Sequence, residues 1–495
     1  MKFKIALLSI LIHGCCYLSA YSAIEFTDLD FWQREHLENQ ELRIRSYSRS
    51  LSYQLDIQPW ASDPWENKSD TPWVEGVLRQ VETEYSASSQ MPVVQNREGL
   101  WITKGSNLMA SAKMGLVSRY LSLWLEPLYA WHENQSLTNH PEGASQPSTS
   151  GSFRYPREIE SYTDVTLHTG YLVLNLSNWY LLAGKDALRF GSGKHDNLHL
   201  SNSAEPFPMV RLGTISPWDT RTGFWSFLTY VGEMEENRAI PHAKLSGWRL
   251  NWSTQKRMEF GLSRAWFVGG DGQDNSFQHV TGNLYGELTK PKGQKYYSDL
   301  RNQQFVADFR FKIPEIQHVF YMEFGREDHE HTLNDARIEW DHSQAHIIGI
   351  KQLFDHDFFF IVERANNVQP RDQRATRGII YWYTHGEYTN GWTYDGINLG
   401  HHMGADSEDS FLGFGQEKSD YSWMFFADTE LHGIAGTPKN QQEYKTEVGL
   451  TGFYQVSRQW RVDASILMQN FENFGKVADN SLASNAWSFG VRFTP

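Results

Sequence analysis

Two short segments of the sequence place histidines beside acidic residues, a combination that could hold a metal ion. Segment 326–331 contains two histidines among three acidic residues, and segment 401–409 begins with His401 and His402 and ends with Asp409. Imidazole and carboxylate groups are both ligands of divalent ions. However, the acids do not follow the spacing of an EF-hand loop, and both segments resemble solvated loops. We therefore expect no resident metal and no cofactor.

The sequence contains no short motif of a known catalytic site. It has no Gly-x-Ser-x-Gly nucleophile elbow, no P-loop, and no Rossmann fingerprint between a strand and a helix. Serine, histidine and aspartate are plentiful, but no spacing selects a Ser-His-Asp triad. Paired carboxylates for glycoside cleavage are defined by a separation in space, which a sequence does not give. We name no catalytic residue and expect that the protein is not an enzyme.

The remaining chemistry lies in aromatic and polar residues of segments expected to be loops. Aromatic faces can stack on sugar rings, while amide, carboxylate and guanidinium groups can pair with sugar hydroxyl or carboxylate groups. The alternative is that rings near strand ends form a girdle at a membrane interface. Polysaccharide binding would use a set of candidate residues in these loops: Trp392, Tyr394, Tyr388, Tyr296, Tyr297 and Arg154.

The elements that would position these loops are strands. From about residue 100 onward, apolar residues recur at every second position, as in 305–313, where Phe309 alternates with Asp308 and Arg310. Each run is about ten residues long, which is the length that a tilted strand needs to cross a bilayer. Counting the runs gives seventeen strands. A further short one near 209–214 or 333–341 would make eighteen, and single-chain bacterial barrels have even numbers.

Short and long connections alternate between these runs. Residues 312–316 and 455–459 form tight turns, whereas 131–158, 269–300 and 386–408 are long and polar. This asymmetry is typical of an outer-membrane barrel, whose outward apolar face must contact lipid. A soluble β-sandwich or propeller is the alternative. We predict an all-β fold: a transmembrane, outer-membrane antiparallel β-barrel over residues 96–495.

The amino terminus predicts export. Lys2 and Lys4 precede an apolar stretch that ends in small residues, so residues 1–23 resemble a signal peptide cleaved after Ala20 or Ala23. Residues 24–95 carry apolar residues at spacings of three and four, including Val74, Val77, Leu78 and Val81 in the stretch beginning at Trp73, and we expect a mostly helical segment at the periplasmic end.

Charge and composition restrict the partners. The chain has 495 residues, 14% of them aromatic, and removal of residues 1–23 with their two lysines changes the formal net charge from −14 to −16. This acidic balance argues against nucleic acid. An acidic polymer would need a local basic group or bridging Ca²⁺. Gly269–Asn275 resembles a Ca²⁺ loop in composition alone, and a Gly-rich loop tip explains it as well. We expect a monomer that contacts outer-membrane lipids.

Several segments together resemble the capsule assembly Wzi family. They are Ile215–Phe227, Ile240–Leu250, Met258–Arg264, Ala307–Lys312 and Gly400–Asp406, of which the Pro-His-Ala-Lys stretch in the second is the most specific. The resemblance runs in order over most of residues 24–495. It implies an eighteen-stranded outer-membrane barrel with a small helical bundle at its periplasmic end. It also implies a lectin-like role in holding capsular polysaccharide on the bacterial cell surface.

Three functions remain open at this point. An anchor for capsular or looser extracellular polysaccharide predicts an occluded barrel with aromatic and polar outer loops. A porin-like diffusion channel predicts an open, water-filled lumen. An outer-membrane enzyme would need a convergent catalytic site at a loop or rim. The lumen-facing candidates Asp308, Arg310, Lys312, Arg461 and Asp463 carry both signs of charge and suit the first two equally.

Overall fold

The computed structural model describes most of the chain from residue 75 onward. The described residues are 75–118, 120–136, 160–215, 217–254, 257–281, 302–313, 316–327, 343–371, 374, 379, 381–418 and 420–495. The predicted signal peptide (1–23), residues 24–74 of the predicted helical segment, and the candidates Arg154, Tyr296 and Tyr297 lie outside these residues.

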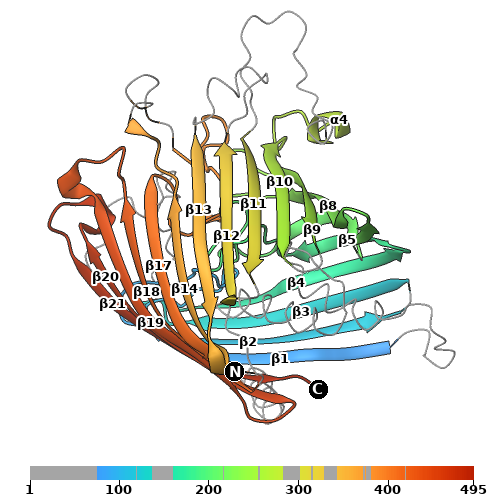
Figure 1. Cartoon of the computed structure of the whole chain (residues 1–495), viewed down its shortest axis with the longest axis horizontal. Helices are drawn as coiled ribbons and strands as arrows, with labels where there is room; N and C mark the ends of the chain where they lie inside the picture. Colours follow the sequence, from blue (N-terminus) through green and yellow to red (C-terminus); the bar gives the residue numbers. More distant parts are fainter. Residues whose placement is uncertain are drawn as a thin grey trace, which may run out of the picture.

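One closed antiparallel β-barrel makes up the described chain (Figure 1). Its strands are β1 Glu75–Ser88, β2 Gly105–Val117, β3 Leu121–His132, β4 Tyr162–Leu176, β5 Trp179–Asp186, β6 Phe207–Thr214, β7 Trp218–Thr220, β8 Gly223–Glu233, β9 Lys244–Ser253, β10 Met258–Val268, β11 Gln303–Ile313, β12 His318–Glu327, β13 Gln344–Leu353, β14 Phe358–Asn366, β17 Ser407–Glu417, β18 Tyr421–His432, β19 Glu443–Gln455, β20 Trp460–Glu472 and β21 Leu482–Phe493. Consecutive strands of this list pair with each other, except that β6 and β7 both pair with β8, and β1 pairs with β21 to close the ring.

The described barrel wall has eighteen strand positions. The sheet contains 19 strands, but β6 and the three-residue β7 both pair with β8 and form two parts of one wall strand. Few other elements are present in the described residues: the hairpin β15 Thr393–Tyr394 and β16 Ile397–Asn398, the helix α4 Phe277–Thr281, and the 3₁₀ turns η5 Asp355–Asp357, η6 Lys439–Gln441 and η7 Phe474–Lys476. The predicted eighteen-stranded barrel is confirmed.

The alternation of side chains has the predicted orientation. On β11, Asp308 and Arg310 are buried in the barrel interior, whereas Phe309 is partly exposed on the outer face. Phe309 lies in register with Phe260 of β10 and Met322 of β12, so apolar side chains are neighbours across three strands. Side chains of a strand alternate between its two faces. An apolar period of two therefore predicts which residues face the lipid and which face the lumen.

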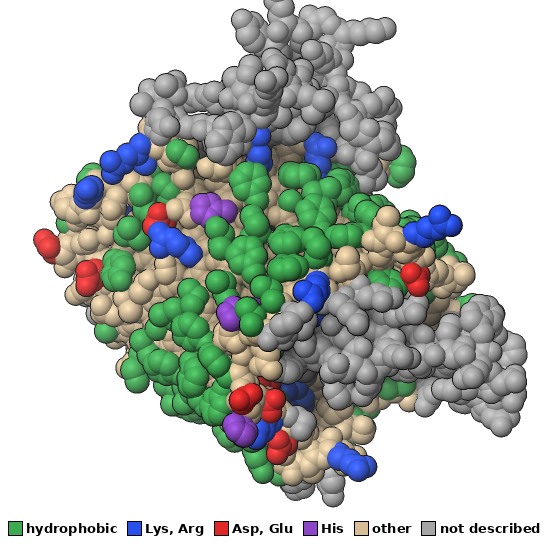
Figure 2. Space-filling model, viewed as in Figure 1, with side chains coloured by type: hydrophobic (Ala, Val, Ile, Leu, Met, Phe, Trp, Pro, Cys, Tyr) green, Lys and Arg blue, Asp and Glu red, His purple; other side chains and the backbone are tan. Residues whose placement is uncertain are grey.

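The outer wall carries the apolar surface that a lipid environment requires. Large apolar side chains are exposed on most wall strands, and Figure 2 shows hydrophobic side chains spread over the face that it displays. Ring pairs such as Trp225–Trp252 and Trp460–Phe493 lie near the short turns. This position fits the interfacial girdle of membrane barrels. No helix among the described residues is long and apolar enough to span a membrane.

The predicted helix in the stretch from Trp73 is wrong for its described part. Residues Glu75–Ser88 form β1, the first described strand of the barrel, so the barrel begins before the expected boundary at residue 96. A register irregularity between Leu78 and Gln80 places Leu78 opposite Met114 and Val81 opposite Ala112. Met114 and Ala112 are two residues apart on β2 and share a face, so Leu78 and Val81 also share one. The bulge therefore reproduces a helix-like spacing of three within a strand.

Connections between strands differ at the two ends of the barrel, as predicted. Turns such as Leu176–Trp179 and Gln455–Trp460 are short, whereas the connections 186–207 and 366–407 are long. We call these the turn end and the loop end. Two of the long connections do not stay outside: residues 188–204 and much of 381–406 are buried. The main apolar cluster joins side chains of these two segments to the inner wall.

Candidate functional site

The connection between β5 and β6 enters the barrel and occupies its interior. We call residues 187–206 the plug loop; nearly all of its residues are buried. A buried irregular segment must satisfy its backbone amide groups without water. Two glutamates of the wall, Glu323 on β12 and Glu363 on β14, accept the hydrogen bonds that this loop donates.

Glu323 receives four hydrogen bonds from the plug loop. The backbone amides of Ser192 and Gly193 donate to its Oε1 at 2.8 Å, Asn197 Nδ2 donates to the same atom at 2.7 Å, and the amide of Leu198 donates to Oε2 at 2.9 Å. Gly191 has φ of +138°, and a Cβ there would lie 2.2 Å from Glu323 Oε1. The loop can approach the carboxylate because this residue is glycine.

Glu363 binds the next turn of the same loop. The amides of Lys194 and His195 donate to its Oε2 at 2.6 and 3.1 Å, and the amide of Asp196 donates to Oε1 at 3.3 Å. Tyr321 of β12 donates its hydroxyl to Oε2 at 2.8 Å. The two carboxylates thus hold consecutive plug-loop residues against adjacent parts of the wall.

A second connection packs on the plug loop from the loop end. We call residues 381–406 the second lumen loop. Tyr383 donates its hydroxyl to the carbonyl of Leu198 at 2.7 Å, and Trp392 Nε1 donates to the carbonyl of His199 at 2.8 Å. The Trp392 ring stacks on His199, with ring centroids 5.7 Å apart. Burial and the Arg249 guanidinium lower the pKa of His199 to about 3, so this imidazole is neutral.

The predicted sugar-stacking rings of this loop are not exposed. Trp392 has no solvent-accessible surface, Tyr388 is 3% exposed and Tyr394 is 8% exposed. Tyr388 donates its hydroxyl to the carbonyl of Gly269, and the Tyr394 ring lies near Phe207. The expectation that these three rings present their faces to solvent is wrong, because the loop that carries them turns into the barrel instead of remaining outside.

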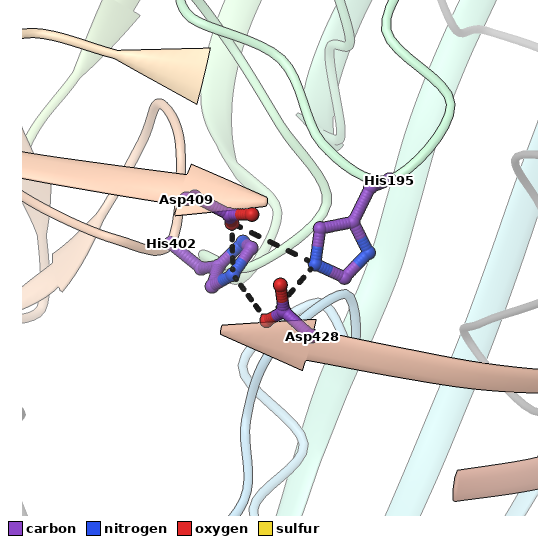
Figure 3. A group of neighbouring side chains, drawn as sticks. All are labelled: His195, His402, Asp409 and Asp428. Atoms are coloured by element: carbon purple, nitrogen blue, oxygen red, sulfur yellow. Dashed lines mark ion pairs between the residues drawn. The ribbon is translucent and has the colours of Figure 1, made fainter. Parts of the chain in front are cut away.

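A buried cluster of histidines and acids lies where the two loops meet the wall (Figure 3). His195 comes from the plug loop and His402 from the second lumen loop, while Asp409 and Asp428 come from β17 and β18. His195 Nε2 lies 3.8 Å from Asp409 Oδ2 and 3.5 Å from Asp428 Oδ2. His402 Nε2 lies 3.2 and 4.0 Å from the same two oxygens.

Further polar groups surround this cluster. His402 Nδ1 is 2.7 Å from Asp196 Oδ2, and Lys445 Nζ lies 2.5 Å from Glu430 and 2.7 Å from Glu447. Burial by itself lowers the pKa of His195, but Asp428 and Asp409 outweigh burial and raise this pKa to about 9. The arrangement joins both loops to the wall through charged groups. All residues of segment 401–409 except Glu408 are buried, so its interpretation as a solvated loop is wrong.

An open pocket lies in the lumen on the turn side of this cluster. Its lining includes the apolar residues Phe411, Met424 and Phe426 together with the polar Gln95 and His195. On β18, Met424 and Phe426 precede Asp428 and are nearer the turn end. The plug loop and the second lumen loop thus fill the lumen on the loop side of this pocket.

Comparison with known families decides the classification. Residues 79–485 match the family described as "Capsule assembly protein Wzi". The chain belongs to the Wzi family. The resemblance read from the sequence is therefore confirmed, and the segments that carried it, such as Ile240–Leu250 and Gly400–Asp406, lie within the matched range.

Individual relatives of this Wzi-family chain are distant. One is a Klebsiella pneumoniae protein described as "Uncharacterized 55.8 kDa protein in cps region"; it is 26% identical over 149 residues, and the match spans 29% of each protein. A solved Escherichia coli structure, described as Wzi, an outer membrane protein involved in group 1 capsule assembly and a carbohydrate binding β-barrel, covers 97% of this chain and 99% of its own. Its TM-score is 0.65 at 16% identity, so it has the same fold.

A further solved structure matches at lower similarity. Acinetobacter baumannii OccAB1 has a TM-score of 0.47 and 11% identity, over 86% of this chain and 98% of that one.

Sequence reasoning found part of this site. It selected His401, His402 and Asp409 for their chemistry, and the lumen-facing Asp308 and Arg310 for their alternation. It missed the plug loop, because 187–206 carries neither an apolar period nor a known motif. The segment is rich in Gly, Ser, Asn and His. This composition, in a connection between two barrel strands, was the available sign that the segment folds into the lumen.

Proposed function

We propose that this Wzi-family barrel holds capsular or extracellular polysaccharide at the outer surface of a bacterial outer membrane. Family membership over residues 79–485 is the observation that carries the proposal. The E. coli relative, whose description says that it binds carbohydrate and is involved in capsule assembly, has the same fold. The exposed apolar wall supports an outer-membrane location, because lipid accepts such a surface and water does not.

The filled lumen favours an anchor over a diffusion channel. A porin needs a continuous aqueous path, whereas here the plug loop and the second lumen loop are fixed inside the wall by Glu323, Glu363 and the Tyr383 hydroxyl. Purified protein in planar bilayers should give no stable ion conductance of the size seen for open barrels. A steady, voltage-independent open channel would favour the porin alternative.

Polysaccharide contacts would come from the loop end of the barrel. The candidates Arg154, Tyr296 and Tyr297 remain proposed contacts, while Trp392, Tyr388 and Tyr394 are proposed to support the loops from inside. Single ring contacts contribute about 1 kcal/mol each, so retention would depend on many weak contacts repeated along a polymer. We propose a monomer in outer-membrane lipid, since a closed wall leaves no strand edge to pair.

The test measures polysaccharide that stays on cells. Deleting the gene should lower the ratio of cell-bound to released polysaccharide while the total and the polymer length stay constant, because an anchor neither makes nor cuts the polymer. Restoring the wild-type gene should restore the ratio, and a variant with Arg154, Tyr296 and Tyr297 all changed to Ala should not. An unchanged ratio after deletion would refute the anchor, and shortened polymer in the presence of purified protein would favour an enzyme.

An acidic polymer would add a dependence on Ca²⁺. The chain is acidic overall, so bridging cations or a local basic group would be required for such a ligand. Washing cells with a chelator should release an acidic polysaccharide and leave a neutral one bound.

A further inference from the structure

The cluster of His195, His402, Asp409 and Asp428 has a donor set that the anchoring role does not explain. Four side chains from four separate segments direct one nitrogen or oxygen each toward a common point (Figure 3). These four atoms all lie within 4.8 Å of one another. All four residues are buried. We propose that they bind one divalent transition-metal ion of the Zn²⁺ type inside the barrel.

The spacing of the donor atoms fits a tetrahedral ion. Zn²⁺ binds histidine nitrogen and carboxylate oxygen at about 2.0–2.2 Å, so two ligands of a tetrahedral site are about 3.3–3.6 Å apart. The four nitrogen-to-oxygen distances between the imidazoles and the two aspartates range from 3.2 to 4.0 Å. Shifts of a few tenths of an ångström would bring these four nitrogen-to-oxygen distances to the required separation, and the other two donor pairs lie within 4.8 Å.

The two aspartates form their ion pairs with imidazoles. In the described part of the chain, every ion pair of Asp409 and Asp428 is with an imidazole. Imidazole nitrogen and carboxylate oxygen are both ligands of divalent ions. Lys445 is close, but its ammonium group contacts Glu430 and Glu447 instead. A bound divalent ion would offset both aspartate charges at once.

Hydrogen bonding leaves the donor atoms available. Asp409 Oδ2, both carboxylate oxygens of Asp428, and His402 Nε2 are buried without a hydrogen-bond partner in the described structure. Buried polar groups are nearly always satisfied by a protein group, a water or an ion, and one divalent ion would satisfy these four atoms together. The Gln95 side-chain amide lies 3.2 Å from His195 Nε2 and would have to turn away when an ion binds.

The rings are held in the orientation that binding needs. Asp196 Oδ2 contacts His402 Nδ1 at 2.7 Å, which fixes the proton on Nδ1 and leaves Nε2 free to ligate. A carboxylate behind a ligating histidine is the usual outer support of a zinc site. The His195 ring stacks on Phe411 of β17, with ring centroids 4.0 Å apart and 17° between the planes. The ion would join the plug loop, the second lumen loop and two wall strands.

The experiment measures the metal itself. Protein purified without chelator and equilibrated with Zn²⁺ should retain about one zinc per chain after gel filtration. X-ray absorption should give four nitrogen and oxygen neighbours at about 2.0 Å and no sulfur, and Co²⁺ in its place should give the visible absorption of a tetrahedral site. The ligand variant Asp428→Asn should retain less than a tenth of the zinc. The supporting variant Asp196→Asn should bind zinc about 10–100-fold more weakly.

A matched control separates metal binding from damage to the loop. His199→Gln changes another buried histidine of the plug loop whose Nδ1 contacts Ser263, outside the cluster, and should leave zinc content unchanged. If Asp428→Asn does not fold, the test rests on two other measurements. These are the X-ray absorption spectrum of the wild type and the zinc affinity of Asp196→Asn. Wild type without zinc above background would overturn the proposal and leave protonated imidazoles as the counter-charges. Equal zinc in wild type and both aspartate variants, or equal loss in His199→Gln, would also overturn it.

Discussion

Changing Glu323 to Gln should release the plug loop while the barrel wall stays intact. The side chain keeps its size, but its charge is lost and one acceptor oxygen becomes an NH₂ donor. Glu323 Oε1 accepts three hydrogen bonds, and Oε2 accepts the amide of Leu198. In the best orientation the Gln carbonyl keeps the three bonds, and its NH₂ faces the Leu198 amide, which loses its partner.

The expected size of the effect follows from these four bonds. A hydrogen bond to a charged group contributes about 1.5–3 kcal/mol and a neutral one about 0.5–1.5 kcal/mol, and an unsatisfied buried donor costs about 1–3 kcal/mol. The free energy for local opening of the plug loop should therefore fall by about 3–6 kcal/mol, which is roughly 10²–10⁴-fold in the opening equilibrium.

Hydrogen exchange of the protein in lipid nanodiscs measures this opening directly. Amides of segment 192–198 should exchange faster by roughly that factor, while amides of the wall strands keep their protection. Asp463→Asn is the matched control, because Asp463 is also a buried lumen-facing acid but pairs with Arg461 on its own strand. Unchanged protection of 192–198 in Glu323→Gln would refute the reasoning, and so would an equal increase in the Asp463 variant.

Other changes test the outer face, the buried rings and the neutral histidine. Phe309→Arg should cost about 2–4 kcal/mol in folding into liposomes if the side chain meets lipid at mid-depth, whereas Phe309→Leu should cost little. Trp392→Ala should leave a cavity and destabilise the lumen loops by about 3–5 kcal/mol, which faster hydrogen exchange would show. Released polysaccharide with unchanged exchange would instead indicate that Trp392 contacts the sugar directly. Because the pKa of His199 is about 3 in the fold and about 6.5 when unfolded, the loops should lose stability as pH falls from about 6.5 toward 3, and this loss should be smaller in His199→Gln.

The strands were predictable because their pattern is local. Alternation of Asp308 and Phe309 reports the two faces of one strand without knowledge of its neighbours. The first described strand was missed for an equally local reason: the bulge after Leu78 gives Leu78 and Val81 a shared face at a spacing of three. A single sequence offers no sign of that bulge, since it depends on how β1 pairs with β2.

The lumen site was less predictable because its parts are distant in the sequence. His402 and Asp409 are close together and were singled out, but His195 is about 200 residues earlier, and Glu323 lies on a strand between them. A lumen-facing acid indicates an interior position without indicating which loop will reach it. The same limit explains why Trp392 was expected at the surface: the composition of a long polar loop does not reveal whether it folds outward or inward.

The pairing of β1 with β21 has a consequence for how the barrel assembles. Ala87 lies opposite Trp487 and Val81 opposite Phe493, and the Ser88 and Ser484 hydroxyls at this seam are 396 residues apart in sequence. Until this last pairing forms, the sheet has two unpaired edges that can join other chains. Closing so long a segment costs little more entropy than closing a shorter one, but the contact cannot form before the rest of the sheet exists. A substitution that weakens the pairing of β1 with β21 should therefore slow membrane insertion, and open sheets that are prone to aggregate should accumulate. Barrels that do close should remain as long-lived as the unaltered protein.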